Sequence, residues 1–120
     1  MAGLMRITER SVADVTILEL EGRLILDEGD TPLRDYVNQL VAKGRVKILL
    51  DMRNVTHLDS AGIGMLVSKY LTAYRKGGRV KLLHLTIRGG HLMNVTRLST
   101  VFEIFESEDE AIRSFGLEPV

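Results

Sequence analysis

The 120-residue chain contains no cysteine. This absence excludes a disulfide framework, a metal site built from thiolates and a cysteine nucleophile. The chain also lacks an excess of charge of either sign, because sixteen Lys and Arg residues balance sixteen Asp and Glu residues. Without such an excess, the electrostatic footprint of a nucleic-acid or anionic-membrane binder is missing. The composition therefore favours a protein partner, with no direct contact to nucleic acid.

Long apolar runs are missing as well. No run approaches the roughly eighteen apolar residues that a membrane span requires, and residues 1–10 lack the apolar core of a signal peptide. We therefore expect a cytoplasmic protein with no membrane span. The length corresponds to one domain, residues 1–120, which is long enough to bury about two thirds of its unfolded surface.

The first half of the chain predicts a hairpin, a helix and a strand. Apolar residues alternate with polar ones over residues 5–20, a pattern typical of an antiparallel hairpin. Thr31 and Pro32 are typical of the N-cap and first position of a helix, which is expected to stop at Gly44. The apolar run 46–51 then predicts a buried strand.

The second half continues the alternation of helices and strands. A helix is predicted to end at Gly77-Gly78, followed by a strand over residues 80–85, a helix over 90–98 and a strand over 101–105. A capping box that begins at Ser107 opens a last helix. Strand, helix and strand with short connections indicate an α/β fold with a mixed, mostly parallel sheet of about five strands, about four helices and an N-terminal antiparallel hairpin.

The stretch 55–64 connects the buried strand to the central helix. Asp59 and Ser60 are both good N-cap residues, so this helix is expected to begin at or next to Ser60. The positive end of the helix dipole would then tolerate a phosphate on the Ser60 hydroxyl. The residues expected to face the core recur at helical spacing: Ile63, Leu66, Val67, Tyr70, Leu71 and Tyr74. Gly62 and Met65 lie off this stripe.

Catalytic and cofactor motifs do not fit this stretch. A hydrolase elbow, Gly-x-Ser-x-Gly, would need a glycine at Leu58, and a dinucleotide fingerprint would need its third glycine at Val67. We therefore expect a non-enzymatic protein without a cofactor. The three histidines, His57, His84 and His91, fall in different predicted elements, so we expect no metal site. The basic residues at 75–81 are interpreted as a solvated rim.

A resemblance to a known family is carried by Leu58-Asp59-Ser60-Ala61-Gly62-Ile63-Gly64 after Ile48-Leu49-Leu50-Asp51, by Glu21-Gly22-Arg23-Leu24, by residues 77–82 and by 101–105. This resemblance is to the bacterial anti-sigma factor antagonists of the STAS domain family. It implies that Ser60 is phosphorylated by a serine kinase that is also the anti-sigma factor, and that a serine phosphatase reverses this. The unmodified form would bind the anti-sigma factor and free its sigma factor.

The resemblance also suggests where the partner binds. Asp59, Gly62 and Met65 are the expected contact residues beside Ser60. Many family members carry an aspartate at the position of Ile25, and Asp27 is the candidate to replace it. The alternative function is a STAS scaffold or structural subunit of a stress-signalling or lipid-transport complex, which would not use this switch. The serine directly after Asp59 favours the antagonist.

Overall fold

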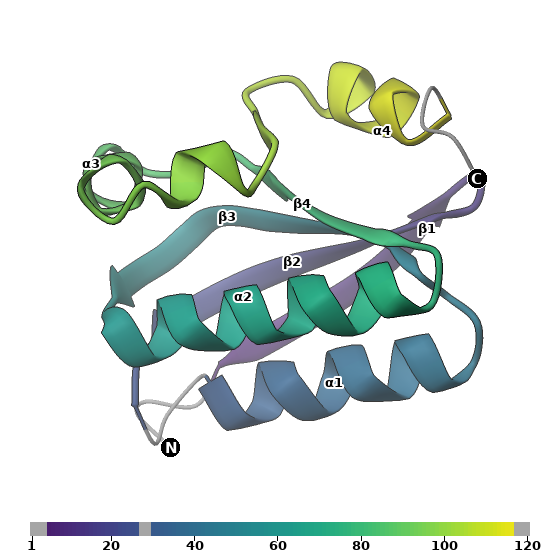
Figure 1. The fold of residues 1–120 in the computed structure, drawn as a ribbon, viewed down its shortest axis with the longest axis horizontal. Coiled ribbons are helices and arrows are strands. Elements are labelled where there is room, and N and C mark those ends of the chain that lie inside the picture. The colour runs from purple at the N-terminus through teal and green to yellow at the C-terminus, as the bar shows by residue number, and fades with distance from the viewer. Residues whose placement is uncertain (1–4, 27–29, 117–120) are drawn as a thin grey trace.

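The computed structural model describes residues 5–26 and 30–116. Helices and strands alternate after an initial hairpin (Figure 1). Their bounds are β1 (Arg6–Val12), β2 (Val15–Leu24), α1 (Asp30–Ala42), β3 (Lys47–Leu58), α2 (Ser60–Arg75), β4 (Arg79–Leu83), α3 (Ile87–Val95), the 3-10 turn η1 (Leu98–Thr100), β5 (Ile104–Phe105) and α4 (Glu108–Gly116). The predicted α/β fold with its N-terminal hairpin is confirmed.

The strands form one sheet in the order β1-β2-β3-β4-β5. The β1–β2 pair is antiparallel and the other three pairs are parallel, because the chain crosses over through α1, through α2 and through the α3–η1 segment. β3 is longer than predicted. It pairs with β2 as far as Leu58, but its pairing with β4 ends at Asp51. Residues 52–58 therefore extend beyond the end of β4, towards α2.

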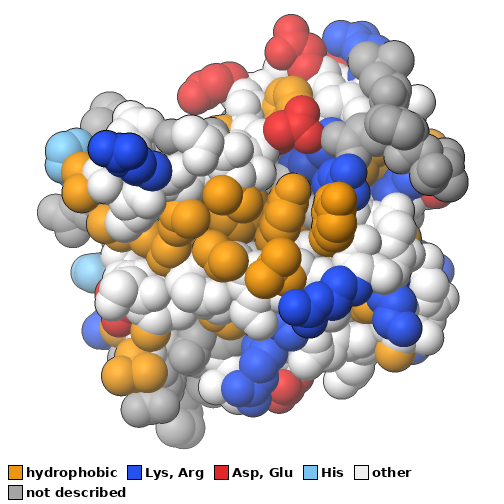
Figure 2. Space-filling model, viewed as in Figure 1, with side chains coloured by type: hydrophobic (Ala, Val, Ile, Leu, Met, Phe, Trp, Pro, Cys, Tyr) orange, Lys and Arg blue, Asp and Glu red, His pale blue; other side chains and the backbone are white. Residues whose placement is uncertain are grey.

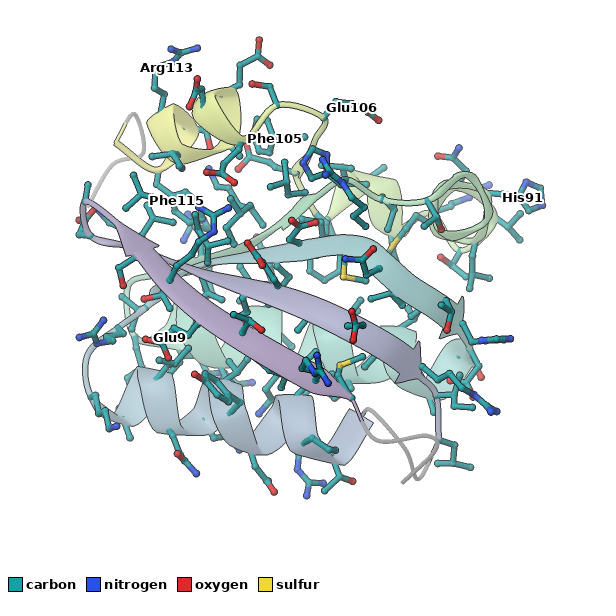
Figure 3. The ribbon with its side chains drawn as sticks, turned by 180° about the vertical axis from the view of Figure 1, so that it is seen from behind. Glu9, His91, Phe105, Glu106, Arg113 and Phe115 are labelled. Atoms are coloured by element: carbon teal, nitrogen blue, oxygen red, sulfur yellow. The ribbon has the colours of Figure 1, made fainter. Side chains whose placement is uncertain are left out.

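Helices cover both faces of the sheet (Figure 1). On one face α1 and α2 enclose the larger core, and Leu18, Leu50 and Leu82 are fully buried there. On the other face α4 covers a smaller cluster, to which Phe105 of β5 and Phe115 of α4 contribute (Figure 3). Successive residues of one strand point to opposite faces, so β2, β3, β4 and β5 each supply side chains to both cores.

The predicted apolar stripe of α2 is only partly buried. Ile63 and Leu66 belong to the core, but 42% of Leu71 and 52% of Tyr74 are exposed, so their assignment to the core is wrong. Tyr74 instead stacks on Tyr70, and the Arg79 guanidinium lies 4.6 Å from its ring centre. An exposed apolar band runs between α2 and the α3–η1 segment (Figure 2).

The interpretation of residues 75–81 as a solvated rim is wrong for Lys81. Only 1% of its side chain is exposed, because α4 covers this part of β4. The Lys81 ammonium donates to Ser114 Oγ at 2.9 Å, pairs with Glu103 at 2.9 Å and lies 4.6 Å from the Phe115 ring centre. A lysine in a strand thus anchors the last helix.

Some predicted boundaries are shifted. α3 begins three residues before the predicted start at Gly90, because Thr86 acts as its N-cap and accepts from the Gly89 N–H at 3.1 Å. Val95, near the end of this helix, is 65% exposed. Thr31 lies inside α1 instead of capping it. The predicted strand 101–105 shortens to the two residues of β5, since the chain before it forms η1.

Candidate functional site

The junction between β3 and α2 is organised by one carboxylate. Asp59 is the N-cap of α2, and its Oδ1 accepts from the Gly62 N–H at 2.9 Å. Its other oxygen accepts from the Leu26 N–H at 3.2 Å. Asp59 therefore connects the start of α2 to the chain that follows β2. The prediction that the helix begins at Ser60 is confirmed.

The surroundings of Asp59 favour its charged form. The Gly62 N–H is the main cause that lowers the pKa of this carboxyl, with smaller contributions from the N–H groups of Leu26 and Ala61, while partial burial acts in the opposite direction. Donated N–H groups stabilise a carboxylate more than a neutral acid. Asp59 is consequently ionised at neutral pH and complements the positive end of the helix.

Unlike the Asp59 side chain, the Ser60 side chain does not cap the helix. Its side chain is exposed, and its hydroxyl makes no hydrogen bond within residues 5–26 and 30–116. Because Asp59 already caps the helix, Ser60 can change its covalent state without the loss of a cap. A phosphate there would add nearly two negative charges beside the Asp59 carboxylate.

Gly62 and Met65 do not lie on the surface, so the expectation that they stand off the buried stripe is wrong. Met65 is 8% exposed and belongs to the core. A Cβ on Gly62 would lie 2.1 Å from the Leu24 carbonyl oxygen, so α2 approaches the end of β2 closely at this point. Asp27 falls outside the described residues.

The exposed side of α2 contains two residues that were not predicted from the sequence. Gly64 and Ser68 are exposed, and they follow Ser60 at intervals of four residues along one side of the helix. A Cβ on Gly64 would meet nothing within 4 Å. The signal was the run of small and polar residues at this spacing. Ser60, Gly64 and Ser68 together form what we call the α2 open face.

The described parts of the chain contain neither a cluster of metal-binding side chains nor a helix that could cross a membrane. No group of three or more His, Asp or Glu side chains there could hold a metal ion. No described helix is long and apolar enough to cross a bilayer.

Comparisons with known proteins connect this geometry to one family. The model of the STAS domain matches residues 6–111. The anti-sigma F factor antagonist of Paenibacillus polymyxa is 23% identical over 99 residues, which cover 82% of this chain and 84% of that protein. A crystal structure of a putative anti-sigma factor antagonist from Thermotoga maritima has a TM-score of 0.81 at 23% identity and covers 92% of this chain and 94% of its own.

A solved structure of a phosphorylated protein has the same fold. The Bacillus cell fate determinant SpoIIAA in its phosphorylated form has a TM-score of 0.70 at 19% identity, with 91% of this chain and 98% of that chain covered.

Proposed function

Because this chain belongs to the STAS domain family, we propose that it is an anti-sigma factor antagonist controlled by phosphorylation of Ser60. In this proposal the unmodified protein binds an anti-sigma factor, which then releases its sigma factor. The observation that carries the proposal is the exposed hydroxyl of Ser60, which makes no hydrogen bond to the described residues, at the start of a helix that Asp59 caps independently. Similarity to the named antagonists supports the same class of partner.

In this proposal the partner catalyses the transfer of the phosphoryl group to Ser60. An anti-sigma factor that is also a serine kinase would supply ATP, and the Ser60 oxygen would accept the γ-phosphoryl group while ADP leaves. The chain itself contributes the hydroxyl and a rigid support for it. A serine phosphatase would reverse the step by hydrolysis of the phosphate ester.

Release follows from charge and volume at the interface. A phosphate carries nearly two negative charges at neutral pH and would stand beside Asp59, at the end of the α2 open face. A partner seated on that face would meet both the added charge and the added volume. Loss of a close interfacial contact costs several kcal/mol, which corresponds to orders of magnitude in affinity. The fold changes little because the helix cap remains in place.

The contact surface that we propose includes Asp59 and the α2 open face. Leu26, 61% exposed and bonded to Asp59 through its N–H, borders this surface. Asp27, the next residue along the chain, stays a candidate contact. Cytoplasmic localisation agrees with a partner that acts on a sigma factor and is part of the same proposal.

A phosphorylation assay with matched variants tests the proposal. The purified chain is incubated with the anti-sigma factor kinase and Mg-ATP, and its intact mass is measured. We expect the gain of one phosphate, mapped to Ser60, and no gain in Ser60→Ala. Ser68→Ala is the matched control, because it removes another exposed hydroxyl of the same helix, and it should be phosphorylated normally.

Two outcomes would overturn this function. If the kinase binds the chain but never modifies it, the chain acts as a STAS scaffold or structural subunit without the switch. If Ser60→Ala gains the phosphate as readily as the native chain, the modified residue is a different one.

A further inference from the structure

The projecting part of β3 has a strand on one side only. Its pairing with β4 ends where Asp51 faces Leu83, whereas its pairing with β2 continues to Leu58 (Figures 1 and 3). After Leu83 the chain turns away through His84, which has a φ of 56°, and enters α3. Among the described residues, no strand therefore covers the outer edge of β3 beyond Asp51.

The backbone groups of residues 54–58 on this edge have no strand partner among the described residues. The Arg53 N–H is satisfied by the Asp51 carboxylate at 3.1 Å. Beyond it, no backbone hydrogen bond joins residues 54–58 to residues 84–86 in the described part of the chain. The backbone N–H and C=O groups of successive residues in a strand point alternately to its two edges. Some of the N–H and C=O groups of residues 54–58 therefore point away from β2, to the edge that β4 does not cover.

A cavity lies directly beside this edge. Its volume is about 320 Å³, and it opens between the end of β3 and the start of α3. Its wall is mainly apolar, with a few polar groups from Thr56, His57 and Thr86. The residues that line it are Met52, Val55, Thr56, His57, Leu58, Leu85, Thr86 and Gly89. In open α/β sheets ligands bind at the carboxyl ends of the strands, where this cavity lies.

The shape of the edge limits what can pair with it. β3 contains one more residue than β2 between the pairs Asp51↔Glu19 and Asn54↔Glu21, and a second extra residue between Val55↔Gly22 and His57↔Arg23. Such bulges bend a strand and increase its twist. A long, flat strand cannot follow this edge, which argues against open-ended pairing with a second copy. A short extended segment can.

We propose that the free edge of residues 54–58 binds a short extended peptide segment of a protein partner, with one apolar side chain inserted into the adjacent cavity. Main-chain hydrogen bonds give such a complex its affinity, and the pocket for alternate side chains gives it specificity. The backbone of the peptide occupies the position that β4 leaves empty. This site is separate from the Ser60 hydroxyl and does not depend on its phosphorylation.

A model peptide with two methylated versions tests the strand geometry. The probe is a capped Thr-Leu-Thr-Leu-Thr pentapeptide, and the readout is the amide NMR spectrum of the native chain. We expect binding in the millimolar range with shifts at residues 54–58 and 85–89. N-methylation of both leucine amides removes donors from one edge of the peptide, and N-methylation of the threonine amides removes them from the other edge.

Pairing at one edge predicts that the two methylated peptides behave differently. One should bind about tenfold more weakly than the parent, and the other should bind as the parent does. Equal affinity of all three peptides would overturn strand pairing, because the cavity would then take the side chain alone. Shifts elsewhere, or none at saturating peptide, would also overturn it.

A protein variant tests the cavity independently. Leu85→Trp should fill it and abolish the shifts at residues 54–58. Val95→Trp places the same aromatic side chain at an exposed position of α3 and should leave binding unchanged. Unchanged binding in a folded Leu85→Trp protein would overturn the cavity as the side-chain site. The peptide comparison uses the native chain, so it decides the proposal even if Leu85→Trp does not fold.

Discussion

The start of α2 and the layer under α4 differ in the burial and hydrogen bonding of their polar side chains. Under α4, Lys81 is almost fully buried, and its ammonium bonds to Ser114 and Glu103. Nearby, Arg10 pairs with Glu19 at 2.8 Å and with Glu108 of α4. At the start of α2, Asp59 is equally well bonded, but the Ser60 hydroxyl beside it is exposed and bonds to nothing described.

This difference separates groups that maintain the fold from groups that a partner can use. A buried and fully bonded side chain such as Lys81 is expensive to change, because its partners and its volume are lost together. An exposed hydroxyl such as that of Ser60, without a hydrogen bond in the part of the chain that the structure describes, can be changed at little cost to the fold. Substitutions in the α4 layer should therefore alter stability but not recognition, and substitutions at Ser60 should do the reverse.

The largest expected effect on stability comes from Lys81→Ala. It leaves a cavity under α4 and removes the bond to Ser114, so we expect the free energy of unfolding to fall by about 2–4 kcal/mol. Lys81→Met keeps most of the side-chain volume and should lower the free energy of unfolding by about 1 kcal/mol or less. Glu103 loses its ion-pair partner in this variant, but its side chain is 53% exposed and can be hydrated. Urea unfolding of both variants measures the difference. Equal losses would show that the charge, and not the packing, holds α4.

The next effect distinguishes two glycines of the same helix. Gly62→Ala places a Cβ 2.1 Å from the Leu24 carbonyl oxygen, which cannot move aside as a flexible side chain would, so we expect a loss of about 1–3 kcal/mol. Gly64→Ala meets nothing within 4 Å and should stabilise the helix by about 0.5–1 kcal/mol. Thermal unfolding of the pair checks the opposite signs. A neutral Gly62→Ala would contradict the close approach of α2 to β2.

A smaller and pH-dependent effect is expected at Asp59. Asp59→Ala removes the cap of α2 and should cost about 1 kcal/mol at pH 7. Because its hydrogen bonds lower the pKa of Asp59 in the folded state, its contribution is complete above the unfolded value of about 3.9 and is lost as the pH falls through the folded value. Unfolding measured at pH 7 and near pH 3 should show the cost shrink. A cost that stays constant would contradict a charged cap.

The alternation of elements was predictable from the sequence because local signals agreed with the fold. The observed helices and strands were indicated by three local signals: the apolar periodicity, the capping residue Asp59 and the glycines after α2. The predictions failed where burial depended on a distant element. Lys81 looked like a surface residue because the alternation of β4 gives no information on whether α4 covers that face.

In the candidate site, too, some features could be predicted from the sequence and others could not. The helix start at Ser60 follows from residue types over a few positions, and the structure confirms it. The sequence places Gly62 and Met65 on the surface because a helical stripe has no sharp edge, whereas in the structure Gly62 lies against β2 and Met65 belongs to the core. The open edge of β3 was unpredictable, since it depends on β4 ending earlier than its neighbour.

The most direct test of the switch is the affinity of the anti-sigma factor kinase for the unmodified and the Ser60-phosphorylated chain, measured by calorimetry under identical salt. We predict that phosphorylation weakens binding by about a hundredfold or more, the factor that corresponds to roughly 3 kcal/mol at the interface, while the unfolding temperature changes little. Equal affinities for the two forms would contradict the account.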